Sequence, residues 1–148
     1  MAHGISFAVL ALMLFTKHFI ADGPLQSKYQ LDNKGRFLHR GGLEHAALHA
    51  VLTALCVTLW AEFLAPMPAI TGKLIVAICC AEFVAHYLID WTKSKVEQSS
   101  GWVESVVSDD GRRQVLINDK MFFMAFLADQ MLHSFCYVLI VLVVAGYS

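Results

Sequence analysis

Four long apolar stretches, separated by polar segments, set the pattern of the sequence. They cover about residues 4–21, 46–64, 71–89 and 122–145. Each has the roughly 20 residues, or at least about 17, that a helix needs to cross about 30 Å of hydrocarbon. The first stretch lacks a positively charged start and a good cleavage site, so we interpret it as a retained helix. The pattern predicts one all-α domain over residues 1–148, an integral membrane four-helix bundle.

The two longest polar segments, about 22–45 and 90–121, are predicted to be loops at one end of this bundle. Within the second loop, two short apolar runs at 103–107 and 114–117 flank the sequence Ser-Asp-Asp-Gly at 108–111. An Asp-Gly pair between two such runs is typical of a tight β-hairpin. We therefore expect a short hairpin in an otherwise helical protein.

Composition and charge support a membrane location and give an orientation. Hydrophobic residues make up 57% of the chain and charged residues 16%, well below the roughly 25% charged of soluble domains. The formal charge of −1 excludes a strongly basic nucleic-acid-binding protein. All Lys and Arg residues except Lys73 lie in or beside the two long loops. The positive-inside rule then predicts a multi-pass inner-membrane protein with both termini outside the cytoplasm.

Polar residues recur at a spacing of four in each predicted membrane helix. Residues at i and i+4 share one face of a helix. Random placement of His and Asp in a chain of this length gives roughly one such pair at helical spacing, whereas each of the four segments has one. The pairs are His18 and Asp22, His45 and His49, His86 and Asp90, and Asp129 and His133.

Alternating helices bring all four pairs into the cytoplasmic half of the bundle, where they form one constellation. Imidazole and carboxylate groups together are good ligands for a divalent transition metal, with zinc as the first expectation and iron or manganese as alternatives. Asp129 is expected to serve as a ligand or a general base. Lys93 and Lys17 are predicted at the rim of the site, where either could neutralise a phosphate or extend to the interface.

The polar blocks resemble those of one family of small polytopic membrane proteins. The blocks are His18-Phe-Ile-Ala-Asp22, the His45/His49 pair, His86-Tyr-Leu-Ile-Asp90-Trp-Thr-Lys93 and Asp129-Gln-Met-Leu-His133. In this order they are similar to domain of unknown function 3307, found in bacteria and phages. A looser similarity is to predicted membrane-bound metal-dependent hydrolases, which also carry His and Asp at helical spacing. That similarity implies a hydrolytic reaction by analogy with those proteins.

Three classes of function fit the sequence. The first is a metal-dependent hydrolase that opens toward the cytoplasm and acts on a lipid-like or phosphorylated substrate. The second is a transporter or channel for metal ions or protons. The half of the bundle beyond Glu82 offers almost no polar groups, and this blind-ended distribution favours an enzyme. The third is a non-catalytic membrane interaction protein whose polar cluster only holds the helices together. A homo-oligomer is compatible with all three.

Overall fold

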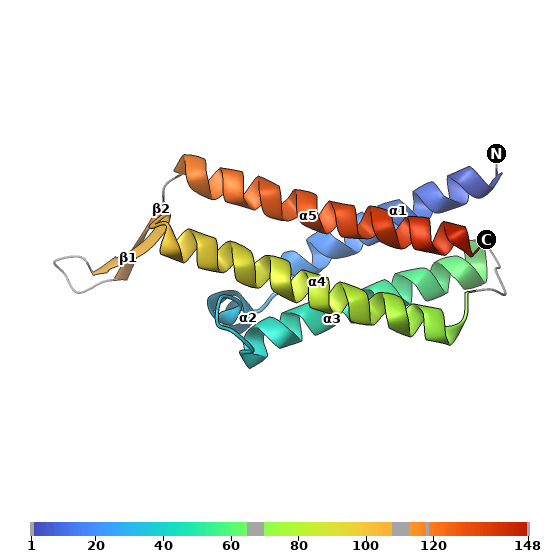
Figure 1. The fold of residues 1–148 in the computed structure, drawn as a ribbon, viewed down its shortest axis with the longest axis horizontal. Helices are drawn as coiled ribbons and strands as arrows, with labels where there is room; N and C mark the ends of the chain where they lie inside the picture. The colour runs from blue at the N-terminus through green and yellow to red at the C-terminus, as the bar shows by residue number, and fades with distance from the viewer. Residues whose placement is uncertain (1, 65–69, 108–112, 118, 148) are drawn as a thin grey trace.

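The structure is a computed structural model, and it describes residues 2–64, 70–107, 113–117 and 119–147. Its elements in chain order are α1 (Ala2–Asp22), α2 (Lys28–Asn33), α3 (Arg40–Leu59) with the π-helical turn η1 (Trp60–Leu64), α4 (Gly72–Ser99), β1 (Val103–Val107), β2 (Arg113–Ile117) and α5 (Asp119–Gly146). Figure 1 shows the four long helices side by side, with both chain ends at one end of the molecule and α2 and the hairpin at the other.

The long helices form a four-helix bundle in which successive helices alternate in direction (Figure 1). α3 packs against α1 and α4, and α5 packs against α4 and α1, so the four helices close into a ring. Four helices of the described chain are long and apolar enough to cross a membrane, and many large apolar side chains point outward from them. The predicted all-α membrane bundle is confirmed, and the chain is a multi-pass membrane protein.

The helices extend further than the apolar stretches predicted. α3 begins at residue 40 instead of 46, α4 continues to residue 99 instead of 89, and α5 begins at residue 119 instead of 122. Hydropathy reports only the part of a helix that faces lipid. The 28 residues of α4 span about 42 Å at 1.5 Å per residue, so the helix is longer than the hydrocarbon layer. The apolar stretch predicted from the sequence therefore covers only part of α4.

The first predicted loop contains the short helix α2. Ser27 caps its start: the Ser27 hydroxyl accepts from the Gln30 backbone N–H, and the Gln30 side chain accepts from the Ser27 N–H. This reciprocal capping box satisfies two backbone donors that a helix start leaves free. α2 packs on α3, and the segment after it returns close to α4. A Cβ at Gly35 would lie 2.9 Å from the Ser94 Cβ, so only glycine fits this approach.

The predicted hairpin is present. β1 and β2 pair antiparallel, with Val103 opposite Ile117 and Val107 opposite Arg113. The Asp-Gly turn expected at 108–111 lies outside the described residues. The hairpin connects α4 to α5 at the same end of the bundle as α2 (Figure 1).

The interior of the bundle is divided along its length. In the half nearer the chain ends, apolar side chains fill the centre, among them Leu10, Leu14, Val57, Trp60 and Ile140. Because lipid tails are as apolar as these side chains, close van der Waals packing stabilises this half of the bundle. In the half nearer α2, most of the large buried side chains are instead His, Asp, Lys and Glu. The site therefore lies at one end of a bundle whose other end is an ordinary packed core.

Candidate metal centre

Each of the four long helices contributes one of the predicted pairs to a single buried cluster. Because i and i+4 side chains share a helix face, the pairs all point into the bundle. Seven of these eight side chains are buried, and the Asp22 side chain keeps 26% of its surface exposed. The cluster consists of His18 and Asp22 on α1, His45 and His49 on α3, His86 and Asp90 on α4, and Asp129 and His133 on α5. The structure thus brings together all eight residues that the sequence predicts as metal ligands.

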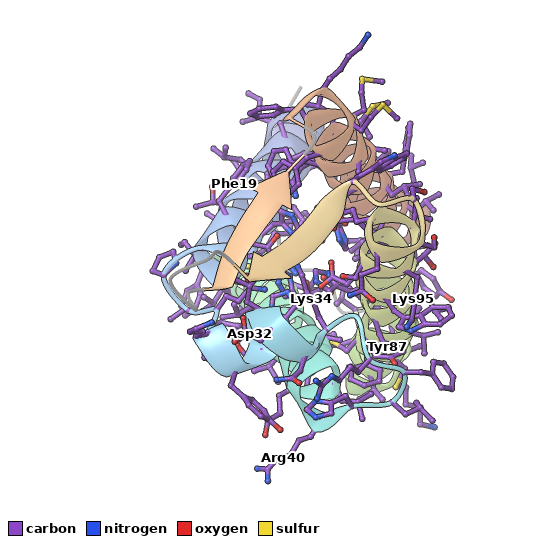
Figure 2. All side chains as sticks on the ribbon, turned by 90° about the vertical axis from the view of Figure 1, so that its left-hand side faces the viewer. Phe19, Asp32, Lys34, Arg40, Tyr87 and Lys95 are labelled. Atoms are coloured by element: carbon purple, nitrogen blue, oxygen red, sulfur yellow. The ribbon has the colours of Figure 1, made fainter. Side chains whose placement is uncertain are left out.

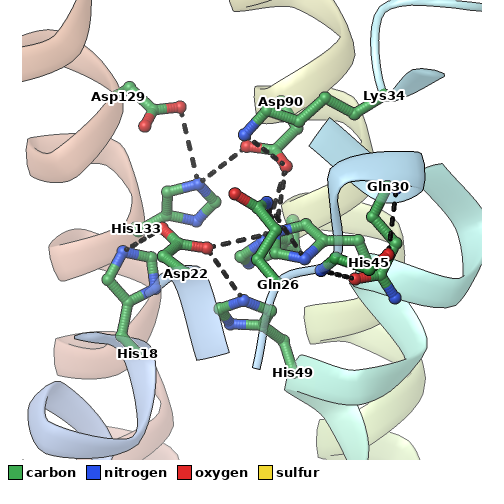
Figure 3. A network of polar contacts seen from close by, with 12 residues as sticks. His18, Asp22, Gln26, Gln30, Lys34, His45, His49, Asp90, Asp129 and His133 are labelled. Carbon is green, nitrogen blue, oxygen red and sulfur yellow. Dashed lines mark hydrogen bonds and ion pairs between the residues drawn. The ribbon is translucent and has the colours of Figure 1, made fainter. Parts of the chain in front are cut away.

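One group in the cluster combines a carboxylate with three imidazoles. Asp22, His45, His49 and His86 each offer a ligand atom within 4.8 Å of the others. The Nε2 atoms of His45 and His49 both lie 3.1 Å from Asp22 Oδ1 (Figure 3). The rings of His49 and His86 stack with their centroids 3.7 Å apart. Three nitrogens and one oxygen at this spacing match the donor set of a zinc site.

A second group combines two carboxylates with one imidazole. Asp90, Asp129 and His133 also offer atoms within 4.8 Å of one another. His133 Nε2 lies 3.6 Å from Asp90 Oδ1 and 3.6 Å from Asp129 Oδ1 (Figure 3). A further group of three imidazoles, His18, His86 and His133, joins this group to the first.

Several ligand atoms of the cluster have no hydrogen-bond partner among the described residues. His86 is 1% exposed, yet neither of its ring nitrogens is hydrogen-bonded. His133 Nε2, Asp90 Oδ2 and Asp129 Oδ1 are also buried without a hydrogen bond. A buried polar atom left unpaired costs about 1–3 kcal/mol, so native proteins rarely keep several together. The donors converge at ligand spacing and fit a divalent metal, which would satisfy them at once.

Lys34 supplies a positive charge from the loop after α2. Its Nζ lies 3.4 Å from Asp90 Oδ2, and its side chain is largely buried (Figure 3). In Figure 2, which faces the end with α2 and the hairpin, Lys34 lies toward the centre while Arg40 points away from the molecule. Burial alone would lower the pKa of Lys34, but the carboxylates of Asp90, Asp22 and Asp129 raise it above its ordinary value. The ammonium therefore stays charged and partly balances the three aspartates.

The comparison with family models gives one match. The model described as "Protein of unknown function (DUF3307)" matches residues 9–148, which include all eight cluster residues. The chain belongs to this family. The search of curated proteins and the search of solved structures found no match. Family membership thus confirms the resemblance seen in the polar blocks. The looser similarity to metal-dependent hydrolases stays a prediction.

Lys17 does not lie at the rim, where the sequence placed it. It is buried in an ion pair with Glu82 and donates a hydrogen bond to the backbone carbonyl of His49 at 3.1 Å. Its Nζ also lies 4.7 Å from the centroid of the Tyr137 ring. The rim prediction for Lys17 is wrong because Glu82, two turns from Asp90 on the same face of α4, gives the lysine a buried partner. The Lys17–Glu82 pair lies between the cluster and the apolar core.

Lys93 lies one turn beyond Asp90 on α4 but outside the three ligand groups. Its Nζ is 3.7 Å from Glu97 Oε1 and about 6 Å from the ring centroids of Phe122 and Phe126. Together with Asp129 it lines a groove of about 470 Å³ between α4 and α5, whose other lining residues are mostly apolar. Lys93 and Asp129 therefore line the same groove, which lies beside the cluster.

Tyr137 is a site residue that the sequence reasoning missed. Its hydroxyl forms a 2.9 Å hydrogen bond with His18 Nδ1, which fixes the ring that presents Nε2 to the cluster. The signal was available, because Tyr137 follows His133 at the same spacing of four. A group that orients a ligand imidazole through its other ring nitrogen, as Tyr137 does for His18, tunes metal affinity. Gln26, from the segment before α2, also reaches the cluster, with its Nε2 3.2 Å from His45 Nε2.

Proposed function

We propose that the protein is a membrane-embedded, metal-dependent hydrolase that acts on a lipid-like phosphate ester. The observation that carries this proposal is the buried His86 ring, whose two nitrogens make no hydrogen bond to the described residues although imidazole and carboxylate groups from four helices surround it. A network that only held the helices together would be expected to satisfy its central member. Ligands that await a metal need not be satisfied by one another.

The donor set suits zinc first, with iron and manganese as alternatives. Asp22, His45, His49 and His86 would hold the ion. When bound, a divalent metal would polarise the phosphoryl oxygens and make water a better nucleophile near neutral pH. The chain's own contribution is then to fix the ligands, exclude bulk water and take up a proton.

Asp129 is suited to the role of general base. It is buried, its Oδ1 has no hydrogen-bond partner among the described residues, and its neighbour His133 is 3.6 Å away. In hydrolysis, water forms a bond to phosphorus, the ester P–O bond breaks, and the leaving oxygen takes a proton. Asp129 would accept the proton that the attacking water loses, and His133 would stabilise the carboxylate.

The groove between α4 and α5 supports an amphiphilic substrate. Its lining is apolar apart from a few polar groups that include Asp129 and Lys93, so an acyl or prenyl chain would lie there with its headgroup near the cluster. The Lys93 ammonium would pair with the phosphate. The positive-inside rule supports an inner-membrane location with α2 and the hairpin on the cytoplasmic side.

The packed core weighs against the transporter alternative. A carrier needs polar groups at successive depths from both faces. Beyond the Lys17–Glu82 pair, the described residues at the centre of the bundle are mainly apolar, including Leu10, Leu14 and Trp60. The buried polar groups therefore lie mainly in one half of the bundle, a distribution that suits an enzyme.

The test is phosphate release from lipid phosphates in mixed micelles by the purified full chain, before and after metal removal. We expect activity that chelation abolishes and zinc or manganese restores. Asp129→Asn should lower kcat by 100-fold or more, whereas Asp32→Asn, at an exposed ion pair on α2, should leave it unchanged. A metal-loaded protein that releases no phosphate from any lipid phosphate would contradict the proposal.

A further inference from the structure

The cluster contains two ligand groups that share no residue. The first consists of Asp22, His45, His49 and His86, and the second of Asp90, Asp129 and His133. Together they offer seven ligand residues, and His18 adds an eighth. A tetrahedral zinc ion takes four ligands and an octahedral ion six. One ion therefore cannot use the whole set.

Asp90 lies between the two groups and faces both. Its Oδ2 is 3.4 Å from His45 Nε2 and 3.7 Å from His86 Nε2, which belong to the first group. Its other oxygen, Oδ1, is 3.6 Å from His133 Nε2, which belongs to the second. The two oxygens of one buried carboxylate are thus directed at different ligand groups.

We propose that the cluster is a two-ion centre in which Asp90 bridges two divalent metal ions. The inference rests on the proposed metal site and adds a second ion to it. Asp22, His45, His49 and His86 hold the first ion, Asp129 and His133 hold the second, and Asp90 gives one oxygen to each. With the second ion bound, Asp129 acts as a ligand in place of the general base of the one-ion site. Asp90 is 4% exposed, and its Oδ2 makes no hydrogen bond within the described chain but lies 3.4 Å from Lys34 Nζ, so the bridge uses an oxygen that the structure holds only by a long ion-pair contact.

The net charge of the cluster indicates which class of substrate the site would bind. Three aspartates against Lys34 give a formal charge of minus two when the imidazoles are neutral. Two divalent ions reverse this to plus two, which a phosphate monoester dianion balances. Paired divalent ions are typical of sites that hydrolyse phosphate esters, because they stabilise the attacking and the leaving oxygen together. The two-ion centre therefore favours a phosphate monoester over a neutral carboxylic ester.

Metal stoichiometry tests the inference without any activity assay. The metal-free full chain in detergent is equilibrated with Zn²⁺, and bound metal is measured after removal of the excess. We expect two equivalents for the wild type, about one for His49→Ala and about one for Asp129→Asn. His39→Asn keeps a good helix N-cap residue at a position outside the cluster, and Asp32→Asn changes an exposed carboxylate, so both controls should keep two equivalents of metal.

A spectroscopic readout on the wild type makes the test independent of how the variants fold. In the Mn²⁺-loaded protein, two ions bridged by a carboxylate should give an exchange-coupled electron paramagnetic resonance spectrum. Asp90→Asn should abolish that coupling. One equivalent in the wild type, lost in His49→Ala and kept in Asp129→Asn, would overturn the second ion and leave the proposed hydrolase intact. One equivalent lost in both variants would also overturn the second ion. Two equivalents without coupling would overturn the bridge, and no metal at all would overturn both proposals.

Discussion

At the scale of single residues, the hydrogen bonding of His86 distinguishes a metal ligand from a histidine with a structural role. When a histidine with a structural role is replaced, the protein loses the hydrogen bonds that the ring made. His86 has none among the described residues, so replacement by an apolar side chain of similar size removes an unfavourable buried group. Such replacements are close to neutral or stabilising.

We therefore expect His86→Leu to leave the melting temperature of the metal-free protein unchanged or raise it. Thermal unfolding in detergent, monitored by circular dichroism, measures this. The same variant should lose the stabilisation that added zinc gives the wild type. A fall of melting temperature by several degrees in the metal-free His86→Leu protein would mean that the ring has a structural role.

Tyr137 gives a second prediction at this scale. Tyr137→Phe removes the hydroxyl that is hydrogen-bonded to His18 Nδ1 at 2.9 Å and keeps the ring that packs in the core. Loss of such an orienting partner typically lowers metal affinity by about 10–100-fold. Competition with a chelator would measure the change, with Tyr29→Phe on the exposed face of α2 as the control. Equal affinities for Tyr137→Phe and the wild type would show that His18 does not contribute to metal binding.

At the scale of elements, the features best predicted from the sequence are those that the bilayer requires, namely long apolar helices. Apolar length locates the four long helices, and a spacing of four locates the eight cluster residues, because both are local properties of a helix. The ends of α3 and α4 extend past their apolar stretches and leave no hydropathy signal. Lys34 could not be placed from sequence, since its contact with Asp90 depends on α2 and on the return of the following segment to α4.

A substitution at Gly35 tests the close approach of the segment after α2 to α4. In Gly35→Ala, the added Cβ would lie 2.9 Å from the Ser94 Cβ on α4. Overpacking of this kind typically costs about 1–3 kcal/mol, and the displaced segment would move Lys34 away from Asp90. The free energy of unfolding should fall in Gly35→Ala. Gly72→Ala, where a Cβ meets nothing within 4 Å, should be neutral or slightly stabilising. Equal stability of the two variants would contradict the close packing.

At the scale of the whole molecule, the Lys17–Glu82 pair separates the polar half of the bundle from the apolar core. Glu82→Gln alone leaves the buried Lys17 charge uncompensated, which typically costs about 3–5 kcal/mol. Removing both charges, in Lys17→Met with Glu82→Gln, should restore most of that stability. Unfolding of the single and double variants measures the recovery.

The same double variant distinguishes an enzyme from a carrier. Neither charge is a ligand in the three groups, so an enzyme should keep bound metal and catalysis when both are removed. A carrier would lose transport, because the pair is the deepest polar step before the apolar core. Loss of metal binding in a stably folded double variant would show that the pair belongs to the site.

The central claim is that the His/Asp cluster binds a divalent transition metal. Elemental analysis of the detergent-purified protein, after reconstitution with zinc, iron or manganese and removal of the excess, tests it most directly. We predict stoichiometric metal in the wild type and in His39→Asn, and a loss of at least one equivalent in His86→Leu. Absence of metal from the wild type under all three conditions would contradict the claim and leave the cluster as a structural polar network.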